Sequence, residues 1–186
     1  LGDVYKRQNQ YRTNDFIIFS AAYQYHFCDR IKPYLETYMT EFENFLSPGR
    51  KGHLIGIGGV SMSSLAEVLN GMGLNITGSD MNESSNVLNL RKKGIPVAIG
   101  HNAENITDDV EFVVRTAAVH DENPEIQAAH AKGIPVFERT QAWGAISKDY
   151  DNALCICGTH GKTTTTSMCT HIMMAADKDP TVMIGG

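Results

Sequence analysis

A short run near the carboxyl end of the chain carries the residue types of a phosphate-binding loop. It reads Gly158-Thr159-His160-Gly161-Lys162-Thr163-Thr164, follows the apolar run 153–157 and begins a segment with apolar residues at helical spacing. A strand, a glycine-rich loop, Lys-Thr and a helix in this order surround phosphates with backbone amides. In such a loop Lys162 neutralises β- and γ-phosphate oxygens, and the Thr163 hydroxyl reaches Mg²⁺. Lys162 and Thr163 are therefore candidate catalytic residues, with Thr163 as the candidate metal ligand.

The composition of this loop separates it from an ordinary turn. Its first glycine stands two residues closer to Gly-Lys-Thr than in the common phosphate-binding loop G-x-x-x-x-G-K-[ST]. The four threonines 163–166 stand at the expected start of a helix. Threonine is a poor choice there, because β-branched side chains lose χ1 freedom in a helix. Nucleotide binding explains them better than helix propensity does.

A second glycine-rich loop, Gly56-Ile57-Gly58-Gly59-Val60-Ser61, lies much earlier in the chain. It follows the apolar run 53–57 and precedes a helical pattern, which is the context of a diphosphate-binding loop. Asp80 follows the next expected strand about 20 residues further on, where an acidic side chain can accept a hydrogen bond from a ribose. Ser61 stands where the dinucleotide fingerprint has its third glycine. The pattern is compatible with both NAD and a UDP-sugar.

Residues 51–150 alternate between strand and helix patterns. The motif "KGIPV" occurs at 93–97 and again at 132–136, each time as a helix-ending glycine that leads into a short strand. This repeated joint predicts an α/β fold with a parallel, Rossmann-like sheet. His101 and Thr116 follow the third and fourth expected strands, at the edge where open sheets bind ligands. The expected strands are 53–57, 74–77, 95–99, 110–114 and 135–137, and the expected helices are capped by Ser61 or Ser63, by Ser84, by Asn123 and by Thr140.

The composition and the apolar pattern argue against two classes of partner, nucleic acids and membranes. The 186 residues are 42% hydrophobic and 20% charged, with a net charge of −5, which argues against a general nucleic-acid-binding surface. The apolar stretch 16–25 is about half of the roughly 20 residues that a membrane helix needs, and it lacks a signal-peptide cleavage pattern. We therefore expect a cytoplasmic protein without nucleic-acid or membrane partners. The sequence does not indicate an oligomeric state.

The four cysteines are expected to be free, buried thiols, because their spacing fits neither a disulfide framework nor a zinc site. They are Cys28, Cys155, Cys157 and Cys169.

Residues 1–38 are rich in tyrosine and phenylalanine at irregular spacing, and Met39 follows them. Our hypothesis is that 1–38 are upstream sequence foreign to the natural protein. The alternative is an amphipathic N-terminal helix that docks on the domain.

The segments "HLIGIGGVSMSSLAEVL" and "GTHGKTTTTS", about a hundred residues apart, resemble the Mur ligase family. The resemblance extends over residues 51–186 and includes "TGSDMNES", "IGHNAENI" and "KGIPVFERT". It implies an N-terminal extension (1–50), a UDP-sugar-binding Rossmann-like domain (51–150) and the first strand, phosphate-binding loop and helix of a truncated ATPase domain (151–186). The family's third domain binds the amino acid.

The resemblance also implies roles for individual residues. Ser61 replaces a glycine that is commoner in the family loop, and Arg115-Thr116 stands where a Ser-Ser pair is usual. The implied ATP-binding residues are Gly158, Thr159, His160, Gly161, Lys162, Thr163 and Thr164. The implied UDP-sugar-binding residues are Gly56, Gly58, Gly59 and Ser61 at the diphosphate, with Asp80, His101 and Thr116 near the uridine and ribose.

The implied reaction uses ATP and Mg²⁺ to phosphorylate the lactyl carboxylate of UDP-N-acetylmuramate. The amine of L-alanine then attacks the acyl phosphate and forms an amide, a step of peptidoglycan precursor synthesis. We expect residues 1–186 to bind the UDP-sugar but to be inactive alone. Two alternatives stay open, an NAD-linked oxidoreductase domain, which has no role for Lys162, and a UDP-sugar-binding module without catalysis.

Overall fold

The computed structural model describes residues 16–21 and 41–184, which belong to two compact units. One unit contains the residues between Tyr38 and Gly144. The other combines the N-terminal residues up to Thr37 with Ala145–Gly186. Each unit has its own sheet and is described by itself.

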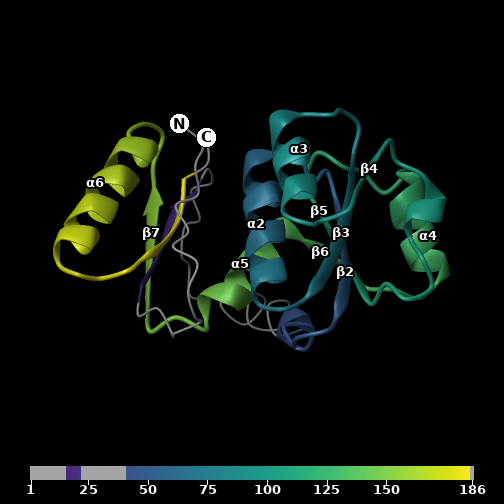
Figure 1. Cartoon of the computed structure of the whole chain (residues 1–186), viewed down its shortest axis with the longest axis horizontal. Coiled ribbons are helices and arrows are strands. Elements are labelled where there is room, and N and C mark those ends of the chain that lie inside the picture. The colour runs from purple at the N-terminus through teal and green to yellow at the C-terminus, as the bar shows by residue number, and fades with distance from the viewer. Residues whose placement is uncertain (1–15, 22–40, 185–186) are drawn as a thin grey trace. The chain divides into compact units, whose positions relative to one another are not determined.

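The Tyr38–Gly144 unit is built on a five-stranded, fully parallel sheet with the order β4-β3-β2-β5-β6. Helices α2 and α3 cover one face and α4 covers the other (Figure 1). The chain runs outward from the central strand β2 to β4 and then returns to β5, so the strand order reverses beside β2, where open α/β sheets bind ligands. The strands are β2 Lys51–Ile55, β3 Asn75–Asp80, β4 Val97–Ile99, β5 Phe112–Arg115 and β6 Val136–Glu138. The connecting elements are α2 Val60–Gly71, α3 Ser85–Lys92, the 3₁₀ turn η1 Ala103–Asn105, α4 Pro124–Ala131 and α5 Arg139–Ser147. The predicted Rossmann-like α/β fold is confirmed.

Strand and helix interiors follow the apolar pattern of the sequence. Leu54 and Ile55 of β2 and Leu65 and Leu69 of α2 are fully buried. The packing also extends back before Lys51, because the buried ring of Phe42 meets Phe112 and Phe137 edge-on, with centroid distances of 5.3 and 5.0 Å. Residues just before the first strand of this sheet therefore close its core.

Two of the predicted helix caps are confirmed. Ser84 Oγ accepts a hydrogen bond from Val87 N at 3.3 Å, and Asn123 Oδ1 accepts one from Glu125 N at 2.9 Å. The predicted serine cap of the first helix is wrong. Helix α2 already begins at Val60, so both serines lie inside its first turns, and Ser63 Oγ donates to Val60 O instead. Its N-cap is Gly59, whose position carries no side-chain hydrogen bond.

The second unit has a three-stranded parallel sheet of β1 Phe16–Ala21, β7 Asn152–Cys157 and β8 Thr181–Met183, in the order β7-β1-β8. Helix α6 Lys162–Ala175 links β7 to β8. Ile17 and Ile18 of β1 are fully buried. The alternative of an N-terminal helix is therefore wrong for residues 16–21, while the rest of 1–38 lies outside the described residues. That 1–38 are foreign to the natural protein stays a hypothesis.

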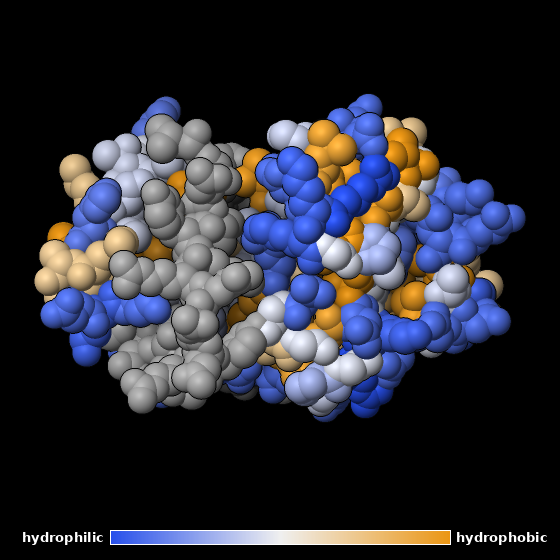
Figure 2. Space-filling view, viewed as in Figure 1, coloured by the Kyte–Doolittle hydropathy of each residue, from blue (hydrophilic) through white to orange (hydrophobic). Residues whose placement is uncertain are grey.

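The expected burial of β7 and its cysteines is wrong. Five of the six β7 residues are exposed, including Cys155 and Cys157, and Cys169 on α6 is half-buried. A parallel strand is buried when helices cover both faces of its sheet, but α6 is the only helix wholly within this unit's described residues. These three thiols are free, as predicted, and Cys28 lies outside the described residues. Helix α6 exposes apolar side chains (Figure 2). Met168 and Ile172, one turn apart on the same face, and Met174 on another side of the helix are each more than half exposed.

Candidate functional site

The loop between β2 and α2 is tied to the carboxyl end of β3. The amides of Gly56 and Ile57 both donate to Ser79 O, at 2.8 and 3.0 Å. Gly58 N donates to Asp80 Oδ2 at 2.8 Å, and Asn86 Nδ2 donates to Gly58 O at 2.8 Å. The glycine-rich loop therefore has a fixed conformation, with bonds on both sides of Gly58.

Asp80 and Thr116 border this loop, as predicted from their places at strand ends. The Asp80 carboxylate accepts hydrogen bonds from Gly58 N and from Asn82 N, the latter at 3.0 Å. A Cβ added at Gly56, which has φ +79°, would lie 2.8 Å from Thr116 Cγ2. Asp80 thus holds the loop, a role that its sequence position did not indicate. Because Asp80 occupies the Gly58 amide, the first amides of α2 are the loop's donors for an anion.

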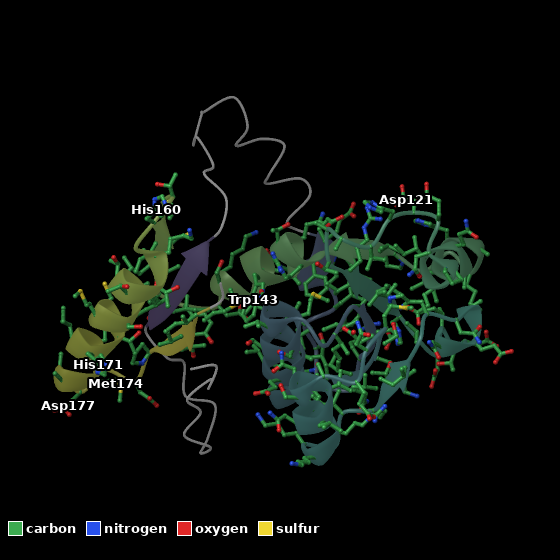
Figure 3. All side chains as sticks on the ribbon, turned by 90° about the horizontal axis from the view of Figure 1, so that it is seen from above. Asp121, Trp143, His160, His171, Met174 and Asp177 are labelled. Atoms are coloured by element: carbon green, nitrogen blue, oxygen red, sulfur yellow. The ribbon has the colours of Figure 1, made fainter. Side chains whose placement is uncertain are left out.

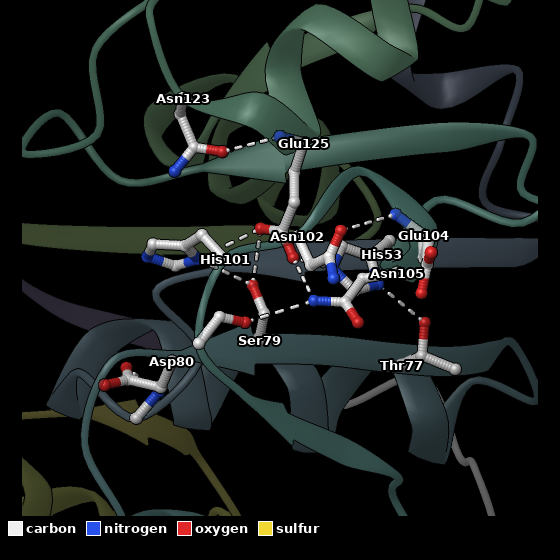
Figure 4. Close-up of polar contacts among 12 residues, drawn as sticks. His53, Thr77, Ser79, Asp80, His101, Asn102, Glu104, Asn105, Asn123 and Glu125 are labelled. Atoms are coloured by element: carbon white, nitrogen blue, oxygen red, sulfur yellow. Dashed lines mark hydrogen bonds and ion pairs between the residues drawn. The ribbon is translucent and has the colours of Figure 1, made fainter.

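His101 belongs to a buried polar cluster that sequence reasoning missed (Figure 4). We define this cluster as His53, Ser79, His101, Asn105 and Glu125. The Glu125 carboxylate is fully buried and accepts hydrogen bonds from Ser79 Oγ at 2.6 Å, His101 Nδ1 at 3.0 Å and Asn105 Nδ2 at 2.5 Å. His53 Nε2 lies 3.6 Å from Glu125 Oε1, an ion-pair distance. The only sequence signal was a glutamate at the second position of a helix in "DENPEI".

The loop between β7 and α6 has the backbone geometry of a phosphate cradle. Gly158 has φ +152° and Gly161 has φ +79°, conformations that side chains rarely adopt. Gly161 is the N-cap of α6 and forms no side-chain capping bond. Lys162 Nζ donates to the carbonyl oxygens of Gly158 at 2.8 Å and Thr159 at 3.3 Å, so its ammonium group lies against the loop. His160 lies at the end of the unit where α6 begins (Figure 3).

The residues of this loop fit a nucleotide triphosphate and Mg²⁺. An uncapped helix N-terminus and a lysine ammonium together favour a phosphate. Thr163 is exposed at the start of α6. The described residues contain no group of three or more His, Cys, Asp or Glu that could hold a metal ion. The Thr163 hydroxyl is one oxygen of this loop that could hold a metal ion.

Comparison with known proteins gives the family. The sequence profile of the Mur ligase family, catalytic domain, matches residues 51–151. A UDP-N-acetylmuramate–L-alanine ligase of Agathobacter rectalis is 52% identical over 134 residues, covering 72% of this chain and 29% of that protein. A relative of the same name in Clostridium novyi is 46% identical over 144 residues. The chain belongs to the Mur ligase family.

Solved Mur ligases share the fold. The crystal structure of a UDP-N-acetylmuramate-alanine ligase from Thermotoga maritima matches with a TM-score of 0.69 and 37% identity, covering 73% of this chain and 32% of that one. A murein peptide ligase from Psychrobacter arcticus matches with a TM-score of 0.60 and 27% identity, covering 69% of this chain and 27% of that one. This Mur ligase chain thus spans about three tenths of the length of the curated relatives it matches. None of the helices within the described residues has the length and apolar character to span a membrane.

Arg115, a departure from the usual family pattern, is committed to ion pairs in this Mur ligase chain. Its Nε donates to Glu138 Oε1 at 2.8 Å, and its Nη1 pairs with Asp121. These pairs lie beside a surface hollow of about 360 Å³ that His120 and Glu122 also line. Thr116, the residue after Arg115, lies beside Gly56 of the glycine-rich loop.

The glycine-rich loop allows a stability prediction. Gly56→Ala combines a left-handed φ with a Cβ that meets Thr116, so we expect it to lower the free energy of unfolding by about 2–4 kcal/mol. Gly94→Ala is the matched control, because Gly94 has φ +82° but nothing within 4 Å of the added Cβ. It should cost only the backbone strain of about 1 kcal/mol. Urea unfolding of both variants measures the difference, and equal losses would contradict the packing of the loop on Thr116.

The carboxyl group of Glu125 has a lowered pKa. Burial raises the pKa, but the interactions with His53, Ser79 and Asn105 outweigh burial and place it below the ordinary value. A carboxylate with a depressed pKa stabilises the folded state at pH values above the unfolded pKa of about 4.3. That contribution is lost as the pH falls through the folded value. The buried carboxylate is therefore an acid-sensitive part of the fold.

We expect the free energy of unfolding to fall as the pH is lowered below about 5. Glu125→Gln removes the titrating group, so the variant should lose less stability than the wild type over the same range. Asp109 and Glu111, whose pKa values are lowered by hydrogen bonds from Lys51 and Arg50, contribute equally in both proteins. Urea unfolding at several pH values between 7 and 3.5 tests this. Parallel pH profiles for the two proteins would contradict it.

Proposed function

We propose that residues 51–150 bind UDP-N-acetylmuramate and that residues 158–164 bind ATP. The two sites would serve a cytoplasmic ligase of peptidoglycan precursor synthesis that joins L-alanine to the lactyl carboxylate through an acyl phosphate. One observation carries the proposal. The chain is 52% identical over 134 residues to a relative named UDP-N-acetylmuramate–L-alanine ligase. Each of its two glycine-rich loops follows a parallel strand and precedes a helix whose N-cap residue forms no side-chain hydrogen bond.

In this proposal the β2–α2 loop receives the diphosphate of the UDP-sugar. Gly56, Gly58, Gly59 and Ser61 border the diphosphate, and the first amides of α2 donate to it. Asp80, His101 and Thr116 lie near the ribose and uridine. The support comes from the bonds that fix the loop, since a loop held by Ser79 and Asp80 requires little reorganisation when it binds.

The β7–α6 loop would hold ATP. Two anions, the lactyl carboxylate and the γ-phosphoryl group, repel each other, so the reaction needs positive charge at the phosphate. Lys162 would supply that charge by exchanging its loop carbonyl partners for phosphate oxygens. Thr163 would be a Mg²⁺ ligand, and bound Mg²⁺ would supply further charge neutralisation. Gly158, Thr159, His160, Gly161 and Thr164 complete the proposed ATP-binding loop.

An NAD-linked oxidoreductase is the alternative that the β2–α2 loop alone allows. It leaves Lys162 and the second loop without a role. Calorimetric titration of the chain with UDP-N-acetylmuramate and, separately, with NAD distinguishes the two. We expect heat of binding with the UDP-sugar and none with NAD. Binding of NAD without a response to the UDP-sugar would overturn the proposal.

We expect residues 1–186 to show no ligase turnover by themselves. They correspond to about three tenths of the relatives' length, and a ligase also needs sites for adenine and L-alanine. A coupled assay for ADP, with UDP-N-acetylmuramate, ATP and Mg²⁺, measures this with and without L-alanine. ADP release that depends on L-alanine would show that the 186 residues are sufficient.

A further inference from the structure

We propose that Glu125 is a positioning residue of the UDP-sugar site, which orients the His101 imidazole so that its Nε2 accepts a hydrogen bond from the bound nucleoside. This role rests on the proposed function of the 51–150 domain. The donor on the ligand would be a ribose hydroxyl or the N3–H of uracil. The glycine-loop motif in the sequence predicts neither a role for Glu125 nor the orientation of the His101 ring.

The buried carboxylate determines where the protons of the cluster lie. An ionised carboxylate only accepts hydrogen bonds, so each of its partners has to donate. Ser79 Oγ donates to Glu125 Oε2 at 2.6 Å, and Asn105 Nδ2 donates to Oε1. His101 Nδ1, at 3.0 Å from Oε2, is therefore the protonated nitrogen of the ring.

Ser79 reinforces this assignment. Its hydroxyl proton is already directed to Glu125, so its oxygen can only accept from His101 Nδ1, which lies 3.0 Å away. Both contacts of Nδ1 thus require the same proton. Rotating the ring by 180° would lose both contacts and leave the buried carboxylate with one donor fewer, which is costly in a buried site.

The other ring nitrogen is left for a ligand. Figure 4 shows the His101 ring with Nδ1 toward Glu125 and Ser79 and Nε2 on the side away from the cluster. The His101 side chain is 14% exposed, whereas that of Glu125 is fully buried. Gly100 N donates to Asp80 O at 2.8 Å, which fixes the segment before His101 beside the candidate ribose acceptor. In the neutral Nδ1–H tautomer, Nε2 is an acceptor.

His53 provides an internal comparison. It approaches the other carboxylate oxygen, Oε1, and its own Nδ1 bonds to Thr77 Oγ1 at 2.9 Å. It is buried, and its two ring nitrogens face Thr77 and Glu125. A change at His53 therefore perturbs the same carboxylate without removing the contact that orients His101.

The test measures affinity for UDP-N-acetylmuramate by calorimetry in a double-mutant cycle. Glu125→Gln and His101→Ala should each weaken binding about 10-fold, because each removes one oriented hydrogen bond. The double variant should bind no more weakly than His101→Ala, because Glu125 acts through His101. His53→Gln should bind within about twofold of the wild type. Additive losses, or an unchanged affinity of Glu125→Gln, would overturn the proposal.

Imidazole ¹⁵N NMR supplies a readout that a merely structural role would not change. We expect the His101 Nδ1–H tautomer in the wild type at pH 7.5 and a mixture of tautomers in Glu125→Gln. A doubly protonated ring, or the Nε2–H tautomer, would overturn the acceptor role.

If the wild type shows the expected tautomer but does not bind the UDP-sugar, the proposed function fails while the contact between Glu125 and His101 stands. Should Glu125→Gln not fold, Ser79→Ala removes the second contact of Nδ1 and should give a smaller loss of the same kind.

Discussion

Replacing Glu125 by alanine is expected to lower the free energy of unfolding by about 3–5 kcal/mol. The carboxylate is fully buried and is the common acceptor for Ser79, His101 and Asn105. Its removal takes one hydrogen-bond acceptor from each of these donors and the facing carboxylate from His53 Nε2, all in a buried site. Leaving a buried donor unpaired costs about 1–3 kcal/mol, and this substitution affects several at once.

Urea unfolding, followed by the fluorescence of the buried and single tryptophan Trp143, measures this loss. Glu122→Ala is the matched control, because Glu122 is exposed and three residues away in the same segment. It should change stability by no more than about 0.5 kcal/mol. If Glu125→Ala cost as little as its control, the buried cluster would not stabilise the domain.

Replacing Asp80 by alanine is expected to weaken binding of UDP-N-acetylmuramate by about 10- to 100-fold. The substitution removes the acceptor of Gly58 N and Asn82 N, so the glycine loop loses one of the bonds that fix its conformation. The sign of the effect is informative. A carboxylate next to an anionic diphosphate repels it, so a purely electrostatic role predicts tighter binding after its removal.

Glu83→Ala is the control for charge. Glu83 lies three residues further along and pairs with Arg91 on the surface, so its removal changes the net charge by the same amount without touching the loop. We expect its affinity to stay within about threefold of the wild type, since exposed pairs contribute little. Tighter binding by Asp80→Ala would show that Asp80 does not hold the loop for the ligand.

The parts of the fold that depend on local sequence could be predicted. Ser84 and Asn123 cap their helices because a cap needs only a side chain and amides two or three residues later. The repeated "KGIPV" joint led correctly to a parallel sheet, because a left-handed glycine after a helix and a short strand recur in βα units. The glycine loop, Asp80 and Thr116 were brought together because parallel strands end at one edge of the sheet.

The parts that depend on distant partners could not be predicted. Ser79 and Glu125 are separated by 46 residues, and nothing in either segment indicates that they pair. The strand β1 was missed because the apolar run 16–21 pairs with β7, more than a hundred residues away. The exposure of Cys155 was missed because an apolar strand is buried only when other elements cover it, and the pattern alone does not say whether they do.

The most direct measurement is amide NMR of the chain during titration with UDP-N-acetylmuramate. Shift changes are predicted at the amides of residues 56–61 and at Asp80, His101 and Thr116, while those of residues 158–164 stay unchanged. Addition of NAD should change none of them. Shifts confined to residues 158–164, or a response of residues 56–61 to NAD alone, would contradict the assignment of the 51–150 domain to the UDP-sugar.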